Sequence, residues 1–126
     1  MPYFKGLFQR DGLSVNLPST CFKCHFKGHG LDFKCHIAGI VGGVDGWNGT
    51  EIESIWVDEA YRRQGIGSAL IRAFEQAAKE NGAGTMVAEP YDWNMEFFRK
   101  NGYVTITGAL EDYPKGHTMY CTEKSL

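Results

Sequence analysis

Two segments with different hydrophobic patterns meet at Arg62-Arg63-Gln64-Gly65-Ile66-Gly67. Before this run, residues 52–57 are rich in β-branched and aromatic side chains, which predicts a strand that ends in a turn. After it, apolar residues recur at the spacing of one helix face, and Asn81-Gly82 ends the pattern. Residues 51–81 therefore predict a strand, a turn that contains two glycines, and a helix.

A strand, a glycine turn and a helix in this order form a binding site for anions. The first N–H groups of a helix lack intrahelical acceptors and lie at the positive end of its dipole. Gly65 and Gly67 have no Cβ that would keep a phosphate away from the backbone. Their spacing differs both from a Walker A loop and from the dinucleotide-binding pattern Gly-x-Gly-x-x-Gly. The residues thus predict a phosphate site of another kind.

The pattern Arg-x-x-Gly-x-Gly, after a strand that ends in Val-Asp, resembles the acetyl-CoA pyrophosphate loop of the GNAT superfamily of N-acetyltransferases, Gln/Arg-x-x-Gly-x-Gly/Ala. Residues 97–103 (Phe-Phe-Arg-Lys-Asn-Gly-Tyr) are similar to a second superfamily segment, Phe-Tyr-x-x-x-Gly-Phe/Tyr. The resemblance covers residues 37–124 and leaves residues 1–35 as a shortened or atypical part. It implies an N-acetyltransferase that moves the acetyl group of acetyl-CoA directly to an amine.

The resemblance also implies where the coenzyme binds. In the superfamily a backbone N–H on the strand before the loop polarises the thioester carbonyl, and the pantetheine arm enters a wedge between this strand and its parallel neighbour. The residues that we expect to contact the coenzyme are Ile55, Trp56, Val57, Arg62, Arg63, Gln64, Gly65, Ile66, Gly67, Ser68, Asn94 and Phe98.

Two glutamates are candidates for the base that removes a proton from the amine. Strand alternation predicts Glu51 and Glu53 on one face, with Ile52, Ser54 and Trp56 on the other. Some superfamily members carry a catalytic glutamate on this strand, and Glu53 is the candidate nearer the expected thioester. His117 and Glu89 are lesser candidates.

The chain departs from the superfamily pattern at the position of the general acid. Many members use a tyrosine near the coenzyme sulfur, but this chain has Phe98 there, and a phenylalanine cannot donate a proton. Tyr113, Tyr120, Tyr91 or water are alternatives, and unassisted departure of the thiolate is another. A coenzyme-A-binding protein of the same fold without catalysis is therefore a further hypothesis.

The length predicts one domain over residues 1–126, and the resemblance implies that it is N-acetyltransferase-like. The net charge of −2 provides no broad basic surface for nucleic acid. No apolar run approaches the ~20 residues of a membrane span, and the first residues do not begin a signal peptide, so we expect a cytoplasmic protein. The four cysteines are then expected to be reduced. The expected partner is a small-molecule or peptide amine, with a homodimer as a further hypothesis because the N-terminal substrate wall is short.

The hydrophobic pattern along the chain predicts an α+β fold. We expect a mixed, mostly antiparallel sheet with one splayed parallel strand pair and helices on both faces, as the resemblance also implies. Residues 85–89 are predicted to lie parallel to residues 51–57, because a strand, a helix and a strand make a right-handed crossover. The other predicted elements are strands over residues 37–44, 103–110 and 117–122, and a second helix over residues 93–101.

Residues 21–35 support a competing hypothesis, a zinc-knuckle protein that binds nucleic acid. Cys21, Cys24 and His29 match the front of a knuckle, with aromatic and lysine side chains between them. Cys35, however, follows His29 after five residues, where a knuckle uses four. The alternative is two strands, residues 21–26 and 33–40, in which the cysteines are small apolar residues. We predict no bound metal.

Overall fold

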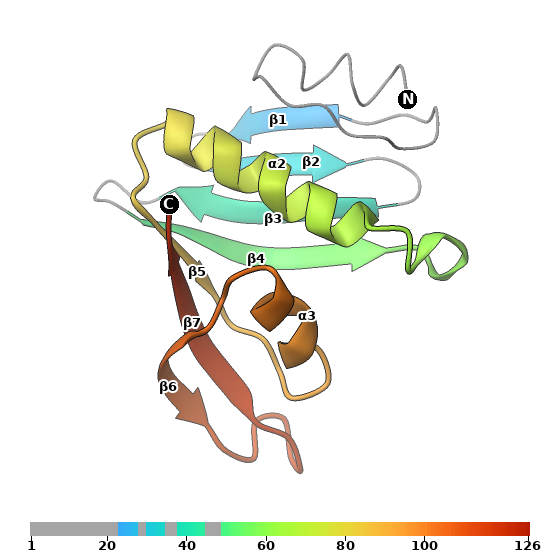
Figure 1. Ribbon diagram of the computed structural model, residues 1–126, viewed down its shortest axis with the longest axis vertical. Coiled ribbons are helices and arrows are strands. Elements are labelled where there is room, and N and C mark those ends of the chain that lie inside the picture. Colours follow the sequence, from blue (N-terminus) through green and yellow to red (C-terminus); the bar gives the residue numbers. More distant parts are fainter. Residues whose placement is uncertain (1–22, 28–29, 35–37, 45–48) are drawn as a thin grey trace.

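The computed structural model describes residues 23–27, 30–34, 38–44 and 49–126. They form one seven-stranded sheet with the order β1-β2-β3-β4-β5-β7-β6 (Figure 1). The strands are β1 (Lys23–Lys27), β2 (Gly30–Lys34), β3 (Ala38–Val44), β4 (Gly49–Val57), β5 (Thr85–Ala88), β6 (Thr105–Leu110) and β7 (Met119–Ser125). A 3₁₀ turn, η1 (Glu59–Tyr61), and two helices, α2 (Ile66–Glu80) and α3 (Met95–Lys100), complete the described elements.

The sheet has the predicted mixed topology. β4 and β5 are parallel, and every other neighbouring pair is antiparallel. The ladder between β4 and β5 ends at the pair Ile52–Ala88, whereas β4 continues to Val57. The two strands therefore separate beyond Ile52, and the α+β fold class with a splayed parallel pair is confirmed.

Several element boundaries differ from the expectation. The helix that begins after the glycine turn is α2, as predicted, and Gly82 follows it with φ of +92°. The second helix, α3, is shorter than the predicted residues 93–101. It begins at Met95, because Asn94 is its N-cap residue. Residues 33–40 do not form one strand, since they contain the end of β2 and the start of β3.

Both described helices pack on the same face of the sheet, in front of it in Figure 1. Phe74 of α2 and Phe98 of α3 belong to one buried cluster with Ile52 of β4 and Met86 of β5. The start of α2 meets α3, since a Cβ on Gly67 would lie 3.0 Å from the ring of Phe97. In the part of the chain that the structure describes, both helices thus pack on one face of the sheet.

A bulge in β4 changes which side chains share a face. Val41 pairs with Ser54 and Gly42 pairs with Ile52, so Glu53 has no partner in β3. The extra residue reverses the alternation beyond it. Ile52 is buried under α2, whereas Trp56 is exposed and its ring lies over Gly39. The prediction that Ile52, Ser54 and Trp56 share one face was wrong, because it assumed an unbroken strand.

Buried polar groups connect α2 to the end of the sheet. The hydroxyl of Tyr103 donates to Glu75 Oε2 at 2.8 Å, and Lys124 Nζ lies 2.9 Å from the same oxygen. Lys124 also donates to the carbonyl of Asn101 at 3.0 Å. Burial of Tyr103, and the negative charge of Glu75, raise the pKa of the phenol above its ordinary range. The carboxylate is thus compensated by two donors from other parts of the chain.

Two neighbouring glycines of β3 provide a test of the packing between the sheet and α2. A Cβ on Gly42 would clash with the carbonyl oxygen of Glu51 and the ring of Phe74, whereas a Cβ on Gly43 would meet Glu53 Oε1 at 3.5 Å, an ordinary contact. We expect Gly42→Ala to lower the free energy of unfolding by about 2 kcal/mol through overpacking. Gly43→Ala, the matched control, should change it by less than about 0.5 kcal/mol. Denaturant unfolding measures both, and equal stabilities would show that the helix does not approach the sheet this closely.

Candidate active site

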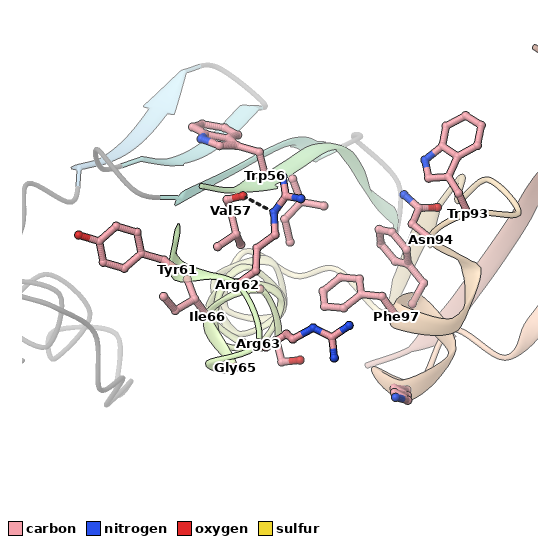
Figure 2. Close-up of a pocket in the computed structure, with 15 residues that line it drawn as sticks. Trp56, Val57, Tyr61, Arg62, Arg63, Gly65, Ile66, Trp93, Asn94 and Phe97 are labelled. Carbon is pink, nitrogen blue, oxygen red and sulfur yellow. Dashed lines mark hydrogen bonds between the residues drawn. The ribbon is translucent and has the colours of Figure 1, made fainter. Parts of the chain in front are cut away.

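A cavity of about 670 Å³ lies where β4 leaves β5. Its walls are the end of β4, the turn before α2, the first turn of α2, and α3 with the residues just before it (Figure 2). Gln64 does not line it. All the other residues predicted to contact the coenzyme do line it: Ile55, Trp56, Val57, Arg62, Arg63, Gly65, Ile66, Gly67, Ser68, Asn94 and Phe98.

Four further residues line the cavity and were missed by the sequence analysis: Tyr61, Trp93, Phe97 and Lys100. Three of them, Trp93, Phe97 and Lys100, follow the spacing i, i+4, i+7, which places side chains on one face of a helical segment. That spacing was visible in the sequence. The superfamily motif that begins at Phe97 does not include Trp93 and leaves the residue at position 100 unspecified.

The turn before α2 has the backbone geometry of an anion site. Gly65 is the N-cap residue and has φ of +78°, a conformation that favours glycine. The first intrahelical bond runs from the N–H of Ala69 to the carbonyl of Gly65 at 3.0 Å. The N–H groups of Ile66, Gly67 and Ser68 therefore have no acceptor within the helix, and these residues line the cavity. Together with the helix dipole they favour a negatively charged group here.

Two arginines beside this turn have different roles in the structure. The Nε of Arg62 donates to the carbonyl oxygen of Val57 at 3.0 Å, which ties the turn to the end of β4. Arg63 has φ of +62° and extends toward α3, as Figure 2 shows. Lys100 lines the same cavity from α3. The cavity therefore offers positive side chains in addition to the free N–H groups of α2.

Glu51 has the electrostatics of a base for neutral pH. It pairs with Val87 of β5, and Glu89 follows directly after this strand. A hydrogen bond with Glu89, partial desolvation, and the charges of Glu89 and Glu53 together raise the pKa of Glu51 to about 7. The hydrogen bond and the charge of Glu89 thus both favour the protonated form of the Glu51 carboxyl. The environment favours Glu51 over Glu53, which the sequence had placed first.

The tyrosines proposed as general acids are not brought to the cavity. Tyr113 is exposed in the loop between β6 and β7, and Tyr120 is half-buried in β7; neither lines the cavity. Tyr91 stacks on Trp93 with ring centroids 4.4 Å apart. Phe98 lines the cavity but is almost fully buried, in edge-to-face contact with Tyr103. The acid roles of Tyr113 and Tyr120 stay predictions that this geometry does not favour.

The zinc hypothesis falls mostly on residues that the structure does not describe. Cys21, His29 and Cys35 lie outside the described residues, and Cys24 belongs to β1. Within the described ranges no group of three or more histidine, cysteine, aspartate or glutamate side chains could hold a metal ion. No helix in those ranges is long and apolar enough to cross a membrane.

Comparison with known proteins assigns the class. The model of the acetyltransferase (GNAT) family matches residues 14–103, more than half of the chain. The chain therefore belongs to the GNAT acetyltransferase family, and the resemblance inferred from the glycine turn is confirmed. A blasticidin-S acetyltransferase from Streptomyces morookaense is 32% identical over 91 residues. The match covers 70% of this chain and 65% of that relative, so the chain spans less than two thirds of its length.

Solved structures share the fold. An acetyltransferase from Bacillus cereus has a TM-score of 0.68 and 29% identity, with 94% of this chain and 84% of that chain covered. A GNAT family acetyltransferase from Elizabethkingia anophelis, crystallised with acetyl-CoA bound, has a TM-score of 0.71 and 18% identity. Here 87% of this chain and 100% of that chain are covered, and the likeness concerns the fold alone.

The effect of Glu89 on the Glu51 carboxyl is measurable. We expect the Glu51 carboxyl to titrate near pH 7 and, in Glu89→Gln, to return toward its ordinary value of 4.5. The folded state then holds this proton more tightly than the unfolded state, so the contribution of Glu51 to stability falls as pH rises from about 4.5 to about 7. Carboxyl carbon chemical shifts followed by NMR give the value. Glu96→Gln, which removes an exposed carboxylate of α3, is the control and should leave it unchanged. A parent titration below about pH 5 would contradict the pairing.

Proposed function

We propose that this protein transfers the acetyl group of acetyl-CoA to the amine of a small-molecule acceptor. The observation that carries the proposal is the cavity between the end of β4 and α3, lined also by the anion-binding start of α2. The free N–H groups of Ile66, Gly67 and Ser68, with Arg63 and Lys100, suit the phosphates of the coenzyme. The separated strands leave room for its extended arm beside the β4 edge.

The chemistry follows from the groups along β4. Amines are protonated at neutral pH, so a base must accept a proton before the nitrogen can attack. Glu51, which does not itself line the cavity, takes that proton through water. The nitrogen then attacks the thioester carbonyl, the C–N bond forms and the C–S bond breaks. Beyond Ile52 the backbone of β4 has no partner in β5, and an N–H on this edge polarises the carbonyl.

The leaving thiolate departs without a tyrosine at position 98. A thiol pKa near ~8.5 makes the thiolate a reasonable leaving group, and water can carry to it the second proton, which the nitrogen loses as the amide forms. Phe98 nevertheless favours a second candidate function, a coenzyme-A-binding protein that has lost catalysis. The two candidates differ in one result, because only the enzyme releases free thiol from acetyl-CoA when an acceptor is added.

The acceptor class has support from the relatives. The curated relative is named for blasticidin S, a small molecule, which favours a small acceptor over a protein lysine. The cytoplasmic location and the homodimer expected from the sequence remain predictions. The nucleic-acid-binding alternative loses support, because family membership accounts for most of the chain.

The coenzyme site is tested with two glycines of matched geometry. Gly65 and Gly82 both have positive φ, +78° and +92°, and a Cβ on either would meet nothing within 4 Å. Only Gly65 lines the cavity. We expect Gly65→Asp to weaken coenzyme A binding at least about tenfold, because its carboxylate would stand where the phosphates bind. Gly82→Asp should bind as the parent does. Calorimetric titration and the coenzyme-induced rise in melting temperature give the affinities. Equal affinities for both variants would show that the turn is not the phosphate site.

The base is tested by pH profiles. Glu51→Gln should lower kcat/KM by roughly 10²-fold and remove the acid limb of its pH dependence, with coenzyme affinity unchanged. Glu53→Gln is the matched variant on the same strand, and its loss should be smaller. Turnover from about pH 6 to about pH 9, read by thiol release, separates the two. Parental turnover and pH profile in both variants would assign proton removal to water or to His117.

A further inference from the structure

β6 is an outermost strand of the sheet and is exposed on both of its faces. It pairs with β7, and no other strand in the described part of the chain lies along its outer edge, as Figure 1 shows. The residues of Thr105–Leu110 are exposed, apart from the half-buried Gly108. Ile106 is 54% exposed and Leu110 is 49% exposed. Burial of these apolar side chains therefore favours a partner at this edge.

The sequence of β6 does little to prevent pairing with another strand. Thr105–Leu110 contains neither a charge nor a proline, and three of its six residues are β-branched. Exposed edge strands usually carry lysine or another charge, which opposes the addition of a strand. β1, at the other end of the described sheet, begins with Lys23 and ends with Lys27. Only the β6 end of the described sheet thus lacks this protection.

A bulge in β6 determines which of its side chains share a face. Ile106 pairs with Thr122 and Gly108 pairs with Cys121, so Thr107 has no partner in β7. Residues that lie directly opposite each other in an antiparallel ladder share a face, and successive residues of a regular strand alternate between faces. The extra residue reverses the alternation beyond it. Residues an odd number of positions apart across the bulge therefore lie on the same face.

Two pairs of β6 residues share a face as a result. Ile106 and Ala109 lie on one face of the sheet, and Thr105 and Leu110 lie on the other. The two large apolar side chains of the strand are thus on opposite faces. A partner that covered one face of the sheet would bury one of them, whereas a strand added at the edge contacts both.

A second copy of β6 fits this arrangement of faces. About a two-fold axis at the centre of the strand, an antiparallel copy places Ile106 opposite Ala109 and Leu110 opposite Thr105. Opposed residues must share a face, and both pairs meet that requirement because of the bulge. Each contact occurs twice, and the free edge of one copy covers the free edge of the other. The assembly therefore closes at two chains.

The charges beside β6 are complementary in the same arrangement. Lys100 ends α3 shortly before β6 begins, and its neighbour Arg99 is already paired with Glu96. Glu111 and Asp112 follow the end of β6 directly. In an antiparallel pair the start of one strand lies beside the end of the other, so the basic side of each copy faces the acidic side of its mate. A parallel pair would instead bring like charges together.

We propose that β6 is the contact surface of a homodimer, in which the β6 strands of two copies pair antiparallel and join the two sheets into one. The inference gives a defined surface to the homodimer expected from the sequence. It does not depend on the proposed acetyl transfer, because no residue of Thr105–Leu110 lines the cavity.

Sedimentation velocity tests the association. Between about 1 and about 200 µM, the weight-average mass of the parent should rise from one chain toward two and no further. Ile106→Lys should weaken the association at least about tenfold, because it places a charge within the strand pair. Ala60→Lys is the control, since Ala60 is exposed in η1, outside the sheet, and it should associate as the parent does. Melting temperatures show that both variants stay folded.

A mixture of two variants tests the register. An equimolar mixture of Ile106→Lys and Ala109→Glu should associate at least about tenfold more tightly than either variant alone, because opposite charges then lie across from each other. Amide hydrogen exchange of residues 105–110 should also slow as the concentration of the parent rises, since their outer N–H groups gain acceptors.

Three results would overturn the inference. A parent that stays monomeric up to about 200 µM would leave the β6 edge to an extended segment of another protein. An Ile106→Lys variant that associates as the parent does would place the contact elsewhere on the surface. Growth beyond two chains, or a mixture that associates no more tightly than its components, would exclude the two-fold pairing of β6.

Discussion

Between the pairs Val41–Ser54 and Gly42–Ile52, β4 contains one residue, Glu53, that has no partner in β3. A bulge of this kind bends the strand and increases its twist, and the ladder with β5 ends at Ile52, directly before it. The cavity depends on that separation. The bulge also keeps Ile55 and Val57 packed against the core under α2 while Trp56 faces the other way. One unpaired residue thus lies where β4 leaves β5 beside the cavity and determines the side of the sheet on which Trp56 lies.

The space where β4 separates from β5 can hold a ligand in a fixed place only because α2 is held firmly against the sheet. Phe74 sits over Gly42, and Arg62 joins the turn to the last carbonyl of β4. The free N–H groups at the start of α2 are therefore fixed relative to the β4 edge. An anionic ligand that these groups bind would then be positioned relative to the β4 edge, as rigid supports of a reacting group must do.

Local features were predictable from the sequence, and features that depend on strand pairing were not. The helical period and the flanking Gly65 and Asn81 defined α2 correctly, and the crossover rule gave the parallel partner of β4. The side of the sheet on which Trp56 lies could not be derived, because the bulge arises only when β3 and β4 are paired. The Glu51–Glu89 pair has the same origin, since the register of β5 brings the two carboxyls together. The places of Trp93 and Lys100 in the cavity were predictable in principle, because their helical spacing is visible in the sequence.

The buried carboxylate of Glu75 has a consequence for biosynthesis. Its two donors, Tyr103 and Lys124, are made after α2, and Lys124 is separated from Glu75 by 49 positions in the chain. While the ribosome is still adding β7, Glu75 lacks its Lys124 partner, and Tyr103 alone would have to compensate the buried charge. Tight packing of α2 must therefore wait until β7 has emerged from the exit tunnel. In this sense the folding of the domain is completed only after its last described strand, β7, has been synthesised. It does not proceed gradually from the first strand.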